Sequence, residues 1–116
     1  MRTLQIHVGE GFDAMAARAL DACRRAEQGE SVGENHLTFD SWQTLVKVLT
    51  PKRMELLHHL RRHPSASIAA LARDVGRDYK RVHEDVEYLT ELGLVERGAD
   101  GGVRVEVDEI RASIAL

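Results

Sequence analysis

The sequence predicts an α+β fold, and three patterns along the chain predict it. Residues 68–92 carry apolar side chains at helical spacing, interrupted once by a glycine, which indicates two short helices joined by a tight turn. Residues 94–107 then alternate around the glycine-rich segment GADGG, a pattern typical of a β-hairpin. Residues 1–40 show the succession strand, helix, strand. The chain therefore combines a small β-α-β extension with a helical region that ends in a hairpin.

The N-terminal residues 1–40 are expected to form the β-α-β extension. Residues 3–8 and 36–39 predict strands, and residues 12–28 predict the helix between them. The apolar face of that helix comprises Phe12, Met15, Ala16, Ala19, Leu20 and Cys23. A unit of this size cannot bury a core by itself, so we expect it to pack on the rest of the chain or on a second subunit. Cys23 is accordingly expected to be a buried structural thiol.

Residues 41–116 are expected to form a second domain, which begins with two helices. The first covers residues 41–49, and the second begins at Pro51, where Thr50 can act as the N-cap. In the second helix His59 and His63 are one turn apart, a spacing that can bind a metal. No cysteine or carboxylate follows at a matching spacing, so solvated or phosphate-facing histidines are the preferred interpretation. We expect no metal and no cofactor.

The helix expected over residues 78–92 has two distinct faces. Its apolar stripe consists of Val82, Val86 and Leu89, and Asp78 is suited to cap its start. On a helical wheel Arg77, Lys80 and Glu84 lie opposite the stripe, Arg81 and His83 flank it, and Tyr79 lies near its edge. A helix that reads the major groove needs this arrangement, because its N-terminal residues must reach base edges. An ordinary amphipathic helix with a solvated charged face fits the pattern equally well.

The hairpin and the tail complete the second domain. Two interpretations fit Arg97 and Arg104: contact with a phosphate or the minor groove, or cross-strand pairing of the arginines with Glu96 or Glu106. Residues 110–116 alternate again, which predicts an added edge strand or a subunit contact.

Composition excludes several classes of protein. No apolar run approaches the ~20 residues of a membrane span, and the N-terminus lacks the apolar run of a signal peptide. The single cysteine cannot form an internal disulfide, so we expect a cytoplasmic protein. No serine, cysteine or carboxylate pattern has a catalytic spacing, so we do not expect an enzyme.

The net charge of -3 is unevenly distributed. Residues 41–81 contain nine basic and three acidic residues, whereas residues 82–116 contain three basic and nine acidic residues. A phosphate-binding face needs local rather than global positive charge, so this block weakly favours nucleic acid as a partner.

The most specific segments are LTPKR at residues 49–53, LARDVGRD at residues 71–78 and LTELGLVE at residues 89–96. On the basis of these segments, residues 37–107 resemble the winged helix-turn-helix transcriptional regulators of the MarR-like and ArsR-like kind. The resemblance is strongest to a group of small prokaryotic regulators described as antitoxin-like.

The resemblance implies sequence-specific binding of double-stranded DNA by a homodimer, which represses a promoter. The residues expected to contact DNA are Arg73, Arg77, Tyr79, Lys80, Arg81, His83, Glu84, Arg97 and Arg104. Lys52 and Arg53 are expected to help hold the DNA backbone. The alternative is a protein–protein interaction module, in which the winged helix is a scaffold and the acidic segments bind a toxin-like partner.

Overall fold

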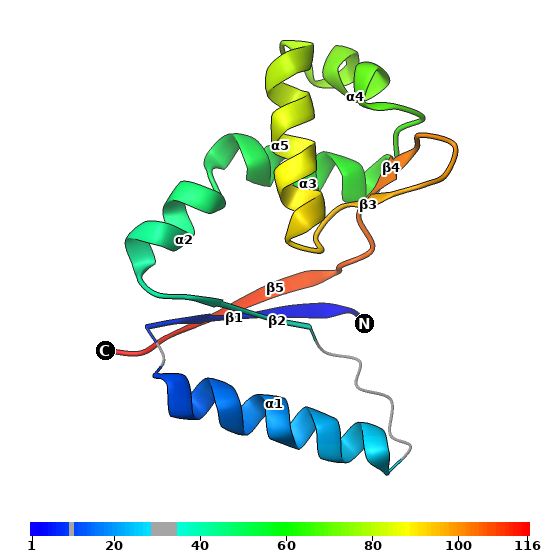
Figure 1. The fold of residues 1–116 in the computed structure, drawn as a ribbon. Helices are drawn as coiled ribbons and strands as arrows, with labels where there is room; N and C mark the ends of the chain where they lie inside the picture. The colour runs from blue at the N-terminus through cyan, green and yellow to red at the C-terminus, as the bar shows by residue number, and fades with distance from the viewer. Residues whose placement is uncertain (10, 29–34) are drawn as a thin grey trace. The chain divides into compact units, whose positions relative to one another are not determined.

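The computed structural model describes residues 1–9, 11–28 and 35–116 and shows a mixed α+β protein (Figure 1). The chain divides into two compact units. Unit 1 comprises Met1–Val48 together with Asp108–Leu116, and unit 2 comprises Leu49–Val107. Every helix in the described ranges is too short or too polar to cross a membrane.

Unit 1 is built on a three-stranded parallel sheet in the order β2-β1-β5. Its elements are β1 (Thr3–Val8), α1 (Phe12–Glu27), β2 (Asn35–Phe39), α2 (Trp42–Val48) and β5 (Glu109–Ile114). In the register of the sheet Ile6 lies opposite Leu37 on one side and Ala112 on the other. The expected β-α-β succession is therefore present, with a third strand beside it.

The sheet has one apolar and one polar face, because side chains alternate along each strand. β1 contributes the buried residues Leu4, Ile6 and Val8 to the apolar face. On the polar face Gln5 Nε2 donates to Ser113 Oγ at 3.3 Å. His7, which is buried, and His36 approach to 2.9 Å between Nε2 and Nδ1. The polar face is thus held together by side-chain hydrogen bonds between neighbouring strands.

Helix α1 lies over the polar face, where Arg18 Nη2 donates to Thr38 Oγ1 at 3.3 Å (Figure 1). Its apolar side is left largely uncovered: Met15 is 39% exposed, Leu20 is 59% exposed, and Cys23 is exposed. The prediction that Cys23 is buried is wrong. The helix turns its Arg18 side toward the sheet because this face of the sheet offers hydroxyl acceptors rather than apolar side chains.

The division of the chain differs from the boundary expected after residue 40. Residues 41–48 and 108–116 belong to unit 1 rather than to the second domain. The reason is that β5 pairs with β1 along its whole length, so the alternating tail is an edge strand of the N-terminal sheet. Of the two predictions for the tail, an added edge strand is the one that the structure shows, and only its assignment to the second domain differs.

Unit 2 contains three helices followed by a short hairpin. Its elements are α3 (Pro51–Arg62), α4 (Ile68–Val75), α5 (Tyr79–Glu91), β3 (Glu96–Arg97) and β4 (Val103–Arg104). The core consists of Leu56, Leu60, Leu71, Val82, Val86, Leu89, Leu94 and Val103, each at most 1% exposed. Side-chain caps start the helices: Thr50, Ser67 and Asp78 accept from the backbone N–H three residues later, at 3.0–3.3 Å.

The hairpin is shorter than the sequence pattern predicts, with two residues in each strand. Ser65, in the segment between α3 and α4, adds a bridge to it: Ser65 and Val103 exchange two backbone hydrogen bonds of 2.9 Å. The hairpin is therefore tied to the helices by the backbone as well as by the core.

Leu71→Ala tests the core of unit 2. The side chain is fully buried, so its truncation should lower the free energy of unfolding by about 2–5 kcal/mol through lost burial and a residual cavity. The measurement is urea unfolding followed by circular dichroism. Arg73→Ala, on the exposed side of the same helix, is the control and should change the free energy by about 0.5 kcal/mol or less. Equal effects of the two substitutions would contradict the described core.

Candidate nucleic-acid interface

The start of α5 is fixed by the three residues that follow α4. Gly76 adopts φ 67° and ψ 36°, a left-handed conformation that glycine adopts without strain. The Gly76 N–H donates to the carbonyl of Arg73 at 3.2 Å, and the Arg77 N–H donates to that of Ala72 at 3.0 Å. This pair of bonds is a Schellman motif, which satisfies the last carbonyls of α4. Asp78 then caps α5, so a short and well-determined turn sets where α5 begins.

The side of α5 that faces away from the core carries Lys80 and Glu84, as the helical wheel predicts. Val82, Val86 and Leu89 are fully buried on the opposite side. Lys80, Arg81 and Glu84 are exposed. Within the ranges that the structure describes, none of the three side chains has a hydrogen bond or ion pair. Two cations and one carboxylate in the first two turns are therefore available to a partner.

Arg77 does not face outward, and the expectation that it would is wrong. Its Nη2 contacts Asp85 Oδ2 at 2.9 Å, and Arg53 Nε contacts Asp85 Oδ1 at 3.1 Å. The three side chains are only 15–18% exposed. The Arg53 guanidinium also lies 4.5 Å from the ring centre of Tyr88. The wheel fails because Arg77 precedes the cap Asp78, whose backbone is not helical.

The role of Asp85 was not predicted from the sequence, although the sequence contains a signal for it. On the wheel Asp85 lies beside the apolar stripe and not opposite it, so a half-buried carboxylate that needs cationic partners is predicted. Arg53 and Arg77 are those partners and come from α3 and from the α4–α5 turn. Because Arg53 is already paired with Asp85, it is less available for the expected contact with the DNA backbone.

Tyr79 and His83 lie together on one flank of α5. Their ring centres are 5.7 Å apart, and Tyr79 is 53% exposed. His83 Nε2 lies 3.4 Å from Glu87 Oε1 one turn further on. The flank thus presents an exposed aromatic ring, with a histidine that already has a carboxylate partner.

The two arginines of the hairpin, Arg97 and Arg104, differ in whether their side chains have polar partners. Arg104 contacts Glu106 through Nε at 2.9 Å and Glu96 through Nη2 at 3.2 Å. The hydrogen bond to Glu106 raises the pKa of Arg104 above its ordinary value, so this side chain stays charged and paired. Of the two interpretations, cross-strand pairing is the one that the structure shows for Arg104. Arg97 is exposed and has no polar partner among the described residues, as is also true of Arg73 on α4.

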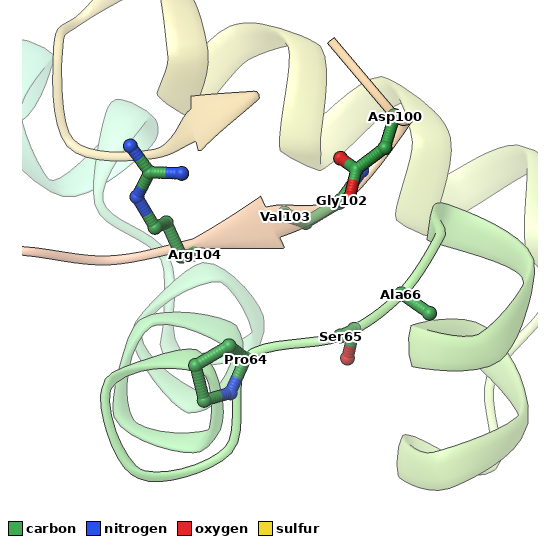
Figure 2. A pocket seen from close by; sticks show the side chains of 7 residues that line it. All are labelled: Pro64, Ser65, Ala66, Asp100, Gly102, Val103 and Arg104. Atoms are coloured by element: carbon green, nitrogen blue, oxygen red, sulfur yellow. The ribbon is translucent and has the colours of Figure 1, made fainter. Parts of the chain in front are cut away.

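A depression of about 200 Å³ lies between the hairpin and the segment that joins α3 to α4 (Figure 2). It is lined by Pro64, Ser65, Ala66, Asp100, Gly102, Val103 and Arg104. Asp100 accepts from the Gly102 N–H at 2.9 Å, and Arg104 is held by two glutamates. Because its charged groups are committed to the turn and the hairpin, we do not place the functional site here.

His59 of α3 and His63, the residue that follows this helix, lie close together, with their ring centres 5.5 Å apart. In the described part of the chain no three His, Cys, Asp or Glu side chains gather closely enough to hold a metal ion.

Charge in unit 2 is balanced, because residues 49–107 contain ten basic and ten acidic residues. The basic residues nevertheless fall into two groups, those paired with carboxylates and those exposed without such a partner. Arg53, Arg77 and Arg104 are paired with carboxylates, whereas Arg73, Lys80, Arg81 and Arg97 are exposed and have no such partner within the described ranges. A phosphate-binding face depends on cations of the second kind.

Asp85→Asn tests whether the cluster fixes α5. Loss of the carboxylate leaves two partly buried guanidinium groups without their counter-charge, so the free energy of unfolding should fall by about 2–3 kcal/mol. Glu84→Gln makes the same chemical change on the exposed side of α5 and should alter it by about 0.5 kcal/mol or less. Urea unfolding of both variants measures the difference. Indistinguishable unfolding curves would show that solvent screens the cluster.

Comparison with known proteins identifies a family. No curated protein and no solved structure matches the chain. The family model described as HVO_A0114 matches residues 48–112, which is more than half of the 116 residues. The matched span contains α3, α4, α5 and the hairpin, and it ends within β5. The chain therefore belongs to the HVO_A0114 family.

Proposed function

We propose that this protein is a sequence-specific DNA-binding transcriptional regulator and that unit 2 acts as a winged helix-turn-helix domain. The observation that carries the proposal is the start of α5, where Lys80 and Arg81 are exposed and without a polar partner while the opposite side is fully buried. The order of elements supports it: α4, a three-residue turn, α5 and a hairpin follow one another as in such domains.

In the proposed complex the first two turns of α5 enter the major groove. Lys80 and Arg81 donate hydrogen bonds to guanine edges or phosphates, because both are cations with no competing partner. Tyr79 and His83 contact the flanking backbone. Arg73 on α4 and Arg97 on the hairpin bind phosphates on either side. Arg53 and Arg77 act indirectly by holding Asp85 and thereby the direction of α5.

The proposed regulator is a homodimer and a repressor that occludes its promoter. One α5 offers only a few side chains to the bases, too few to specify a site in a genome, and a dimer doubles that number with half-sites ~34–36 Å apart. Unit 1 is the proposed interface. The uncovered apolar side of α1, with Met15 and Leu20, gives a second copy a surface to bury.

One observation favours a second function. Beyond Lys80, the outward side of α5 carries three exposed carboxylates, Glu84, Glu87 and Glu91. An acidic surface of this kind suits a basic protein partner, as in an antitoxin-like module whose winged helix is a scaffold. The two functions are compatible in a protein that binds such a partner and also represses its own promoter.

Lys80→Glu/Arg81→Glu tests the DNA-binding proposal. Loss of two cations at the start of α5 should abolish binding to the DNA upstream of the protein's own gene, because one good base contact contributes ~1–3 kcal/mol and the new carboxylates repel phosphates. The measurement is a fluorescence-anisotropy titration at several salt concentrations, against that DNA and against random DNA of equal length.

The matched control is Lys47→Glu/Arg111→Glu, which makes the same change in net charge at exposed positions of unit 1 outside α1. This variant should retain binding. A folded wild-type protein that prefers its upstream DNA no more than random DNA would contradict the autoregulator proposal and leave the protein–protein function as the better one.

Leu20→Glu tests the proposed dimer. A carboxylate in the apolar side of α1 should dissociate the dimer, because a charge cannot be buried there without a partner. Sedimentation velocity measures the mass directly. Ala17→Glu, at an exposed position outside the expected apolar face of α1, is the control and should leave the dimer intact. A wild-type monomer at high protein concentration would contradict the dimer, and dimers of unchanged stability in Leu20→Glu would contradict this interface.

A further inference from the structure

We infer that Lys80 and Glu84 form a two-residue code in which Lys80 recognises guanine and Glu84 recognises the cytosine of a neighbouring base pair. The inference rests on the proposed DNA-binding function and makes it specific, since it names the base class that each residue selects. It assigns a recognition role to Glu84, a carboxylate that without such a role would only repel phosphates in the complex with DNA.

The two side chains are placed to act together. Lys80 and Glu84 are separated by four residues, so their Cβ atoms are ~5–6 Å apart on one side of a helix. Successive bases in a DNA strand are ~3.4 Å apart, so the pair spans neighbouring base pairs of a major groove. Both side chains are exposed on the side of α5 that faces away from the buried Val82 and Val86.

Lys80 and Glu84 are not paired with one another, although their charges are opposite and their spacing permits it. In a helix such an ion pair is more favourable when the glutamate precedes the lysine. Here the glutamate follows the lysine, which is the less favourable order. Within the described residues, neither side chain makes any other polar contact. Both are therefore free to bind a base edge without first breaking an ion pair.

The chemistry of the major groove determines which bases these residues select. A carboxylate only accepts hydrogen bonds, and guanine and thymine present only acceptors there, so both repel Glu84. Cytosine presents the N4 amino donor. Adenine presents its N6 donor beside the acceptor N7, which repels the second carboxylate oxygen. Glu84 therefore favours cytosine, and the donor Lys80 favours the O6 and N7 acceptors of guanine.

The other carboxylates of α5 are less suited to this role. Asp85 binds Arg53 and Arg77, and Glu87 lies 3.4 Å from His83. Glu91 is exposed on the same outward side as Glu84 but lies two turns further from the start of α5. Since the N-terminal residues of such a helix reach the bases, Glu91 is beyond their reach. Glu91 therefore serves as a control, because it has the same charge as Glu84 and lies on the same side of the helix.

The experiment is selection of binding sites from a random double-stranded DNA library, carried out in parallel with the full-length wild type, Glu84→Gln and Glu91→Gln. The wild type should select sites with a cytosine preferred over adenine by roughly tenfold at one position, next to a guanine. In Glu84→Gln that one position should change to adenine, because an amide pairs with both N6 and N7 of adenine. The guanine position should remain. Glu91→Gln should select the wild-type site and bind all DNA somewhat more tightly.

Two results overturn the inference, and they are distinguishable. If the wild type selects a site and Glu84→Gln selects the same site, Glu84 does not contact a base, and the DNA-binding proposal stands without this code. If the wild type selects no site, the proposed function fails and the inference fails with it. Thermal unfolding of each variant shows whether it is folded, and titration against single-base variants of the selected site measures the preference at that position directly.

Discussion

The pairing of Asp85 with Arg53 and Arg77 is the interaction on which the arrangement of the helices in unit 2 depends. The Asp85 carboxylate joins α5 to a guanidinium from α3 and to another from the turn after α4, so three segments share one partly buried charged cluster. A hydrophobic core alone fixes the side of a helix that is buried, but it tolerates rotation and sliding of that helix. Directional hydrogen bonds from two arginines remove that freedom. Any partner that α5 binds meets a helix whose first turn has one orientation.

The Asp85 cluster withdraws two cations and one carboxylate of unit 2 from solvent, so the total charge of the unit does not describe its exposed surface. At the exposed hairpin, Arg104 is paired with two carboxylates, those of Glu96 and Glu106. Lys80 and Arg81, at the start of α5, are exposed and have no carboxylate partner within the described residues. Net charge therefore describes this protein poorly, and the pairing of individual side chains describes it better.

Local features could be predicted from the sequence, and features that depend on distant residues could not. Asp78 and Thr50 as caps, the buried stripe of α5 and the outward position of Lys80 follow from residues within two helical turns. Arg77 was misplaced because it precedes the N-cap of α5, where a helical wheel does not apply. Cys23 was misplaced because the side of α1 that meets the sheet depends on residues outside that helix. The attachment of β5 was missed for the same reason, since its partner strand lies more than 100 residues away. The site at α5 was predictable to the extent that it is a property of one helix.

The pairing of β5 with β1 has a consequence for how the chain is made. Residues 49–107 are inserted between α2 and the strand that completes the sheet of unit 1. During synthesis unit 2 therefore leaves the ribosome before β5 does, and its core can form while β1 still has one unpaired edge. Strand edges of this kind pair readily with other chains. The interval between the emergence of unit 2 and the arrival of residues 109–114 is thus the period in which the nascent protein is most exposed to aggregation.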